Sequence, residues 1–447
     1  MQDTPVKRSI VQKVLEECGV NDLAVASIRE LVRIVDLIEK KSGVRFVRME
    51  MGVPGLPSPE IGVQAEIDAL NKGVSSIYPN IEGIPSLKEE ASRFARLFLN
   101  IDVNSRGCVP TVGSMQGSMA AFMVTSRLNP QRRATLFIDP GFPVQKQQHR
   151  VLGIPFESFD VYDFRGPKLR DKLRSYLDTG TFSSIIYSNP NNPSWICFSE
   201  KELETIGKLA SEYDIVVIED LAYFGMDFRN DISVPGKPPY QATVARYTDQ
   251  YLLLVSSSKV FSYAGQRIGL IIISDALFAR NYPGLKQYFG TESFGKALVY
   301  GALYALSAGA GHSAQFALAA FLKAACDGKY NIVEGVREYE RKAKRMKQIF
   351  LSNGFHLVYE RDEDKPLADG FYFTLAYDGL TGSELLKELL CYGVSAISLQ
   401  ITGSARHEGL RACVSQVEIG QLDALEERIR LFHRHHGSGN NADKGNK

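Results

Sequence analysis

The chain has 447 residues, and its 52 lysines and arginines nearly balance 51 aspartates and glutamates, which gives a formal net charge of +1. This balance gives no reason to expect nucleic acid or an anionic membrane surface as a partner. Hydrophobic residues make up 44% and charged residues 23%, values typical of a globular protein with a large core. The sequence begins MQDTPVKRSIVQKVLEECG, without the basic segment and apolar run of a secretion signal, so we expect a soluble, cytoplasmic protein.

Other features exclude several classes of protein. The longest apolar stretch, residues 301–321, is interrupted by polar residues and glycines, so it predicts a packed helix pair rather than a membrane span. Six cysteines without a CxxC pair are typical of reduced thiols. The histidines in residues 433–436 follow the pattern of a solvated helix end rather than a metal site, and we expect no metal.

Apolar runs alternate with helical patterns between residues 110 and 275. We predict strands at residues 135–140, 183–190, 213–220, 251–259 and 269–274. Continuous apolar runs fit strands that are buried on both faces. Residues 198–213 predict a helix, because a serine stands at its start and apolar residues follow at spacings of three and four. The alternation predicts an α/β fold with a mostly parallel, doubly wound sheet.

The pattern changes after residue 330. A long amphipathic helix is predicted at residues 331–354, then short strands at 355–360, 370–379, 394–401 and 409–417 and a last helix near 419–435. These elements predict a smaller α+β domain. The predicted division is an N-terminal arm that joins the small domain (1–75), a large domain (76–330), a C-terminal small domain (331–436) and a disordered tail (437–447).

Polar residues stand where the predicted strands end, and ligands bind at the carboxyl ends of parallel strands. Asp220 follows one apolar run and would need a cation or hydrogen-bond donors, although a helix cap or an internal salt bridge would also explain it. Lys259 follows another run. A partly desolvated lysine has a lowered pKa and becomes a usable nucleophile, whereas a solvated lysine after a strand has no special chemistry.

Three stretches carry a resemblance to a known family. SNPNNPSW (188–195), EDLAY (219–223) and SSSKVFSYAGQRIG (256–269) resemble the motifs of class I/II aminotransferases, which are pyridoxal-phosphate enzymes of fold type I. Further matching segments lie between about residues 50 and 420, in family order. The resemblance implies the large and small domains described above, pyridoxal 5′-phosphate as cofactor, and a homodimer.

The resemblance assigns roles around the cofactor ring. Lys259 is similar to the Schiff-base lysine that holds the cofactor aldehyde and moves the α-proton. By the same resemblance Asp220 pairs with the protonated pyridine nitrogen, and Asn192 and Tyr223 form hydrogen bonds with the ring hydroxyl. Phe142 stands where the family stacks an aromatic ring on the cofactor.

The resemblance also implies a phosphate site, whose residues come from two segments and from a second subunit. Amides at the start of a helix would bind the phosphate, and serines and an arginine would complete the site. The residues that match are Gly113, Ser114, Met115, Ser256, Ser258 and Arg267, with Tyr78 reaching the phosphate of the neighbouring subunit.

Arg411 lies inside an apolar strand pattern, where a buried guanidinium is costly unless it is paired. A structural salt bridge between the domains is one explanation. The resemblance implies another: Arg411 holds the α-carboxylate of the substrate, helped by Asn192 and the backbone of Gly52. A carboxylate site on one domain and a cofactor on the other imply closure around the substrate.

The sequence departs from the family pattern at Trp195, the only tryptophan, which stands where a glycine is usual. The substitution places a bulky side chain where a positive φ is easily adopted only by glycine. Two interpretations remain. The ring packs against the helix that follows, which we favour, or it narrows the space for the substrate.

Three functions fit these observations. The first is an aminotransferase that passes the amino group of an L-amino acid to a 2-oxo acid. The second is a carbon–sulfur β-lyase with the same cofactor contacts, and the third is a non-catalytic regulator that senses pyridoxal phosphate or amino acids. No GxGxxG follows an early strand and no GxxxxGK[ST] occurs, so a dinucleotide or P-loop site is not predicted. The absence of GxSxG likewise gives no support to a serine hydrolase.

Overall fold

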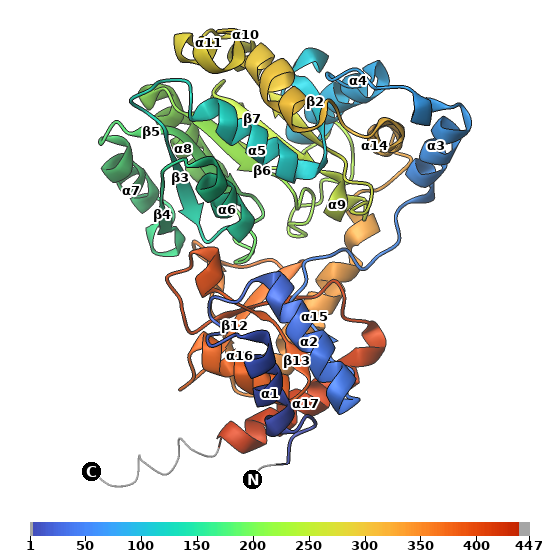
Figure 1. The fold of residues 1–447 in the computed structure, drawn as a ribbon, viewed down its shortest axis with the longest axis vertical. Helices are drawn as coiled ribbons and strands as arrows, with labels where there is room; N and C mark the ends of the chain where they lie inside the picture. The colour runs from blue at the N-terminus through green and yellow to red at the C-terminus, as the bar shows by residue number, and fades with distance from the viewer. Residues whose placement is uncertain (1–2, 438–447) are drawn as a thin grey trace.

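The computed structural model describes residues 3–437 and has two lobes. Figure 1 shows a large lobe around a seven-stranded sheet and, below it, a small lobe around a four-stranded sheet. The N-terminal helices α1 (Arg8–Cys18) and α2 (Ile28–Ser42) lie in the small lobe together with the C-terminal helix α17 (Leu422–His436). The chain therefore begins in the small lobe, builds the large lobe, and returns.

The sheet of the large lobe is mostly parallel, as the sequence predicts. Its spatial order is β2-β8-β7-β6-β5-β3-β4, and only β8 runs antiparallel to its neighbours. The strands are β2 (Cys108–Thr111), β3 (Ala134–Asp139), β4 (Phe156–Asp160), β5 (Phe182–Ser188), β6 (Val216–Asp220), β7 (Tyr251–Ser256) and β8 (Gly269–Ile273).

Helices cover both faces of this sheet, which explains why its strands are apolar without alternation. Ile185 packs in a core beneath α4 (Pro85–Phe94), α7 (Lys168–Leu177), α8 (Glu200–Tyr213) and α14 (His312–Cys326). Its neighbour Ile186 points into a second core, beneath α5 (Gly113–Thr125) and the helical segment η6 (Ala297–Leu303). Successive side chains of a strand point to opposite faces, so a doubly covered strand is apolar at every position.

Local sequence signals set several helix ends. Ser199 and Glu202 form a capping box at the start of α8, and Asp214 ends the helix in the left-handed conformation. The same device, Ser27 with Glu30, begins α2. Such reciprocal hydrogen bonds satisfy two amides that the helix leaves unpaired.

The small lobe surrounds an antiparallel sheet in the order β14-β15-β12-β9. Its elements are β9 (Phe355–Leu357), β12 (Tyr372–Tyr377), β14 (Ile397–Ser398), β15 (Leu410–Cys413), α15 (Glu338–Leu351) and α16 (Gly382–Cys391). A separate parallel pair joins β1 (Val47–Arg48) to β13 (Val394–Ser395), so the N-terminal segment shares the core of the small lobe. Helix α3 (Glu60–Asn71) instead packs on α14 of the large lobe. The predicted domain boundaries remain a prediction.

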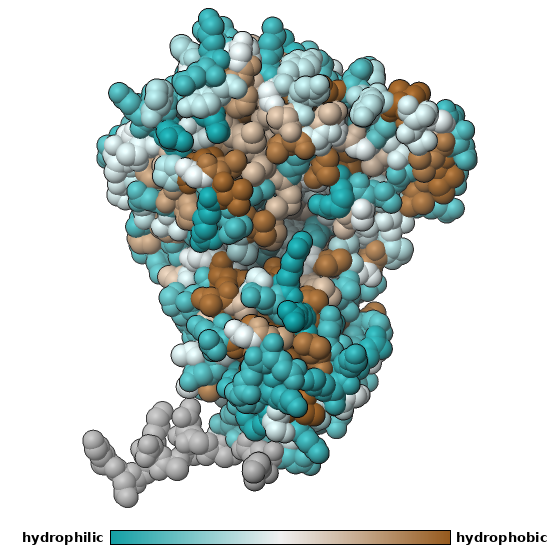
Figure 2. All heavy atoms as spheres, viewed as in Figure 1, coloured by the Kyte–Doolittle hydropathy of each residue, from teal (hydrophilic) through white to brown (hydrophobic). Residues whose placement is uncertain are grey.

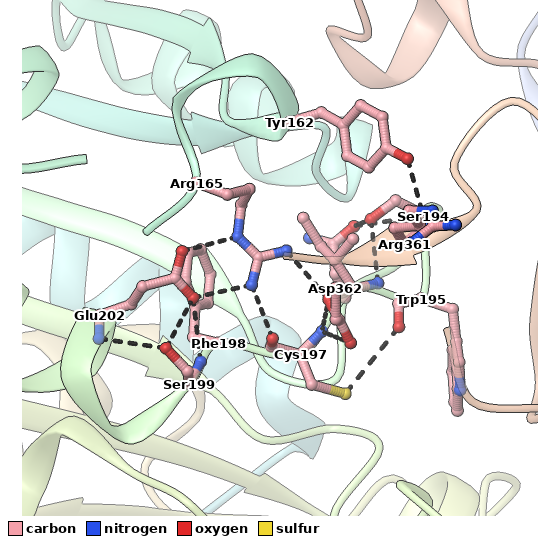
Figure 3. Close-up of polar contacts among 12 residues, drawn as sticks. Tyr162, Arg165, Ser194, Trp195, Cys197, Phe198, Ser199, Glu202, Arg361 and Asp362 are labelled. Atoms are coloured by element: carbon pink, nitrogen blue, oxygen red, sulfur yellow. Dashed lines mark hydrogen bonds and ion pairs between the residues drawn. The ribbon is translucent and has the colours of Figure 1, made fainter. Parts of the chain in front are cut away.

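A buried ionic cluster joins the two lobes (Figure 3). Arg165 of the large lobe pairs with Glu202 at 2.7 Å and with Asp362 at 2.9 Å, and its side chain is 6% exposed. Asp362 belongs to a hairpin of β10 (Arg361–Asp362) and β11 (Lys365–Pro366) and also accepts a hydrogen bond from the backbone amide of Cys197. The cluster therefore ties this hairpin to the loop that carries Asn192 and Trp195. Two carboxylates around one guanidinium offset the cost of burying the charges.

Three predicted elements differ from the structure. The long helix begins at Glu338, because the Asn331 side chain accepts hydrogen bonds from the Val333 and Glu334 amides and forms a separate turn. Residues 394–401 form two short strands in different sheets rather than one. In the stretch 301–321, the predicted helix pair is confirmed, but its first member begins before the stretch: η6 continues directly into α13 (Tyr304–Ser307). Ala308, in the left-handed conformation, separates it from α14.

All six cysteines are free, and four are buried, as predicted. The histidines near the end of α17 are not fully solvated, because His433 and His435 form hydrogen bonds with Tyr377 and Tyr392. No group of three potential metal ligands occurs among residues 3–437. Over the same residues, no helix is long and apolar enough to cross a membrane. Residues 438–447 of the predicted tail lie outside the described residues.

Candidate active site

A pocket of about 480 Å³ lies at the carboxyl edge of the large sheet, with residues of the small lobe in its wall. Twelve residues that the sequence predicted as site residues line it: Gly52, Ser114, Met115, Phe142, Asn192, Asp220, Tyr223, Ser256, Ser258, Lys259, Arg267 and Arg411. Residues from distant parts of the chain meet here because parallel strands end at one edge and the small lobe covers that edge.

Lys259 enters the pocket from α9 (Ser257–Val260), the single helical turn that follows β7. Its Nζ donates a hydrogen bond to the carbonyl oxygen of Gly52, and the Phe371 ring centroid lies 5.4 Å from Nζ. Burial lowers the pKa of Lys259 to about 8. The amine is therefore neutral in about a tenth of molecules at pH 7 and in about half at pH 8, far more than for an ordinary lysine, as a nucleophile or base requires.

Asp220 ends β6 and is buried. Its oxygens accept hydrogen bonds from the Gln145 side chain at 3.0 Å and the Ala222 amide at 3.1 Å. No lysine, arginine or histidine within residues 3–437 lies in ion-pair distance of this carboxylate. Burial raises the pKa of Asp220 to about 6. A buried carboxyl group facing a pocket without a counter-ion is suited to a cationic ligand atom.

The opposite end of the pocket is suited to an anion. Helix α5 begins at Gly113, which has φ 66°, and a side chain there would place its Cβ 2.5 Å from Arg267 Nη2. The Arg267 guanidinium therefore lies against the start of α5. It donates to the Ala264 carbonyl, and no carboxylate of the described chain pairs with it. Amides at a helix start and a guanidinium without a carboxylate are suited to a phosphate group.

Two further features distinguish the end of the pocket that is suited to an anion. Ser256 caps α9 by accepting a hydrogen bond from the Ser258 amide at 3.1 Å, and both serines line the pocket. Arg267 itself has φ 51°, a left-handed conformation that is rare for residues with a side chain. Such backbone strain concentrates at functional sites.

Arg411 is 1% exposed on β15, where the sequence predicted a buried strand. Its Nη1 donates to Asn192 Oδ1 at 3.4 Å, and its Nη2 donates to the Glu50 carbonyl oxygen at 2.5 Å. Its Nε has no partner in the described structure. Among residues 3–437, no carboxylate forms a salt bridge with Arg411, so the alternative of a structural ion pair between the domains is wrong. A buried guanidinium that faces a pocket with donors to spare is suited to a carboxylate.

Trp195 occupies the junction of the lobes rather than the pocket. Its indole is 1% exposed and lies edge-on to Tyr223 and Tyr372, with centroids 5.4 and 6.0 Å away. Any side chain at Gly370 would overlap the indole. Trp195 does not line the pocket, so the ring packs, as expected, rather than narrowing the space for the substrate. Its partners are however Tyr223 and Tyr372 in the core of the small lobe, not the helix that follows (Figure 3 shows Trp195 next to the ionic cluster). Its φ of 65° preserves the backbone conformation that glycine normally supplies.

Ten residues of the pocket wall were not predicted from the sequence as site residues. They are Ile28, Arg29, Val32, Met51, Val53, Pro54, Ser188, Ala222, Ala264 and Tyr372. The Ser27–Glu30 capping pattern could have located the start of α2, but only the packing of α2 in the small lobe brings that helix end to the pocket. Tyr78 is 90% exposed and lies outside the pocket wall, so its predicted contact with a second subunit stays a prediction.

The family model described as aminotransferase class I and II matches residues 49–429. Among curated proteins, the chain is 25% identical over 268 residues to a probable aspartate aminotransferase of Methanocaldococcus jannaschii, covering 58% of this chain and 66% of that one. It is also 25% identical over 243 residues to an LL-diaminopimelate aminotransferase of Natranaerobius thermophilus, covering 52% and 59%. The alignments thus span less than two thirds of these relatives.

Solved structures match over nearly the whole fold. An alanine aminotransferase from Pyrococcus furiosus superposes with a TM-score of 0.73 and 21% identity, covering 94% of this chain and 99% of that one. An aspartate aminotransferase double mutant of Thermus thermophilus gives 0.72 and 18%, covering 92% and 96%. The predicted fold, fold type I of the pyridoxal-phosphate enzymes, is confirmed.

We expect Trp195→Gly to lower the free energy of unfolding by about 2–4 kcal/mol. Removing a buried indole leaves a cavity that costs about 3–5 kcal/mol, and relief of the positive φ returns about 1 kcal/mol. Denaturant unfolding measures the change. The control Asn100→Gly relieves a similar φ of 55° at an exposed position and should change stability by less than about 1 kcal/mol. Equal stability of wild type and Trp195→Gly would contradict the packing role.

The raised pKa of Asp220 predicts a pH-dependent stability of the cofactor-free protein. A carboxyl group whose pKa is higher in the folded state binds its proton more tightly there, so its contribution favours folding below about pH 4 and is lost as the pH rises through about 6. Between about pH 4.5 and pH 7, wild type should lose about 2 kcal/mol more unfolding free energy than Asp220→Asn. Identical pH profiles of the two proteins in denaturant unfolding would show that this carboxyl group is already ionised.

Proposed function

The chain belongs to the class I and II aminotransferase family, and on this premise we propose that it transfers the amino group of an L-amino acid to a 2-oxo acid. Pyridoxal 5′-phosphate is the cofactor. The observation that carries the proposal is the composition of one pocket: a desolvated lysine, a buried carboxyl group without a counter-ion, an anion site and a buried arginine.

The residues present fit the cofactor. Arg267, the hydroxyls of Ser256 and Ser258, and the start of α5 with Gly113 and Ser114 would hold the phosphate. Met115 lines the pocket in the same first turn of α5. Asp220 at the other end would hold the proton of the pyridine nitrogen, which supplies the cation that this buried carboxyl group lacks.

Other residues would orient the ring between these two ends. Phe142, which caps the start of α6 (Pro143–Leu152), lines the pocket and would stack on the ring. Tyr223 and Asn192 would form hydrogen bonds with the ring oxygen. When bound, the cofactor supplies an aldehyde for amine exchange and a ring that withdraws electrons from the α-carbon. Lys259 Nζ would be the base that takes the α-proton, because its lowered pKa increases the fraction of neutral amine.

Arg411 would bind the substrate α-carboxylate with the N–H donors of its terminal nitrogens that remain beside the bonds to Asn192 and Glu50, and Asn192 and the Gly52 backbone border the same place. These residues come from two lobes. We propose that residues 76–330 form the cofactor domain, and that residues 331–436 with part of the segment 1–75 close on it when the carboxylate binds.

The wall that remains for the substrate side chain is largely apolar. Ile28 and Val32 of α2 and Val53 of the following segment supply it, and Arg29 of α2 adds one exposed cation that has no hydrogen bond or ion pair in the described structure. Both apolar and acidic amino acids therefore belong in a panel of amino donors.

We further propose a cytoplasmic homodimer, with amino and 2-oxo acids as its small-molecule partners and no nucleic acid or membrane partner. Exposed apolar side chains gather on α3 (Figure 2, the brown cluster at the right), where Ile61, Ile67 and Leu70 are each 44–45% exposed. Ile77 and Tyr78 follow in the sequence with 58% and 90%. A contiguous apolar patch is typical of a protein interface and supports the dimer, in which Tyr78 would reach the partner's phosphate site.

We expect the purified protein to gain a visible absorption band with pyridoxal phosphate and to exchange amino groups between an amino acid and 2-oxoglutarate or pyruvate. Lys259→Ala should lose the band and at least about a thousandfold in activity, because the attachment point and the base are one amine. The control Lys286→Ala removes an exposed lysine, 72% accessible at its side chain, and should change neither property.

The assay separates the alternatives. Stoichiometric formation of the new amino acid and the new 2-oxo acid supports the transferase. Release of pyruvate and ammonia from cystathionine without an acceptor would support the β-lyase instead, and cofactor binding without turnover of any amino acid in the panel would support the sensor.

The dimer should depend on the apolar face of α3. Ile67→Glu places a charge within that patch and should weaken dimerisation at least about tenfold, measured by sedimentation over a concentration series. Val151→Glu alters a side chain that is 68% exposed on α6, away from the patch, and should leave the dimer intact. A wild-type protein that remains a monomer at all concentrations would contradict the proposed assembly.

A further inference from the structure

Tyr372 is the buried pocket residue that contacts both the proposed ring site and the proposed carboxylate site. It begins β12, pairs in register with Cys413, and is 2% exposed. Arg411 lies two residues before Cys413 on β15, which places it diagonally opposite Tyr372 on the same face of the sheet. The Arg411 Cζ lies 4.5 Å from the Tyr372 ring centroid. The Tyr372 ring therefore contacts the Arg411 guanidinium through a cation–π interaction.

The hydroxyl group of Tyr372 reaches the other site. Its oxygen lies 2.7 Å from the hydroxyl oxygen of Tyr223, and both side chains are buried. Gly52 borders the same oxygen so closely that any side chain there would overlap it. Trp195 lies edge-on to both tyrosine rings, and this packing fixes their relative position. A hydroxyl pair held in this way cannot separate without disturbing the junction of the lobes.

The direction of this hydrogen bond follows from the proposed function, on which this inference rests. If Tyr223 donates its only proton to the ring oxygen of the cofactor, its own oxygen must accept from Tyr372. Burial raises the pKa of Tyr372, and the Arg411 cation opposes that rise, so the guanidinium makes Tyr372 a better donor. Hydrogen bonds in a chain strengthen one another in a buried environment.

We propose that Tyr372 is a positioning residue that links the two sites: its hydroxyl group donates to Tyr223 and strengthens the hydrogen bond from Tyr223 to the cofactor ring oxygen, while its ring holds Arg411 in place for the substrate carboxylate. The two halves of the side chain thus have separate tasks. The small lobe, which carries Tyr372 and Arg411, thereby influences the electronic state of a cofactor held by the large lobe.

The experiment follows the visible absorption of the cofactor-loaded protein as a function of pH. At high pH the ring oxygen of the cofactor carries a negative charge that it does not share with a proton. A hydrogen-bond donor to this oxygen stabilises the high-pH form, so it lowers the pH midpoint of the spectral change. Tyr372→Phe removes only the donor and should raise the midpoint by about half to one pH unit. In a Tyr223→Phe background the same substitution should add no shift, because the hydroxyl group acts through Tyr223.

A second measurement isolates the ring. Titration with 4-methylpentanoate, an unreactive carboxylate with an apolar stem, reports on the Arg411 site. Tyr372→Phe keeps the ring and should bind this probe within twofold of wild type, whereas Tyr372→Leu should bind it about three- to tenfold more weakly. Tyr359→Phe is the control: Tyr359 is also buried, and its hydroxyl group contacts the Ser404 hydroxyl group and donates to Asp160, but it lies outside the pocket. It should alter neither the midpoint nor the affinity.

Each outcome has a clear meaning. The donor role is overturned if the cofactor-loaded wild type and Tyr372→Phe have the same pH midpoint. It is also overturned if Tyr372→Phe shifts the midpoint equally in the Tyr223→Phe background. Unchanged affinity in Tyr372→Leu overturns the support of Arg411. A wild type that develops no visible band with pyridoxal phosphate contradicts the proposed function itself, and with it this inference. If Tyr372→Leu fails to fold, the absorption measurements on Tyr372→Phe still test the donor role.

Discussion

The site depends on charged groups at the edge of the large sheet that have no counter-ion in the described structure, and two of them, Asp220 and Arg411, are buried. Asp220 at the end of β6 has only neutral hydrogen-bond partners, Arg411 on the small lobe has an unpaired Nε, and Arg267 at the start of α5 lacks a carboxylate. Folding alone gains nothing from such an arrangement, because desolvated charges are costly unless they are paired. A ligand with one cationic and two anionic groups would pair all three. Pyridoxal phosphate together with an amino acid has this charge pattern.

The rest of the fold holds these groups in place. Parallel strands covered on both faces converge at one edge, and the small lobe is fixed over that edge by the Arg165–Asp362 cluster and by Trp195. The cluster also holds the loop that carries Asn192. The same ion pairs therefore stabilise both the proposed ring site and the contact between the lobes. In the closure that we propose, the small lobe would therefore move about this contact as a fixed point.

The sequence predicted the part of the site that local patterns encode. Asp220 and Lys259 follow apolar runs, and the end of a buried strand has a defined place in a parallel sheet. Arg411 was visible as a charge in an apolar strand, and Arg267 and Asn192 came from the resemblance to a family. The contribution of α2, with Ile28 and Arg29, and that of Tyr372 depend on how two lobes pack, which no local pattern encodes. In the sequence, Trp195 was recognised only as a departure from the family pattern, and its packing partners could be identified only from the structure.

The central claim is that Lys259 holds the cofactor. Reduction of the loaded protein with borohydride, followed by proteolysis and mass spectrometry, locates the attachment directly. The account predicts that the reduced pyridoxyl group is found on the peptide that contains Lys259 and on no other lysine peptide in stoichiometric amount. A pyridoxyl group on a different lysine, or a loaded protein that reduction leaves unlabelled, would contradict it.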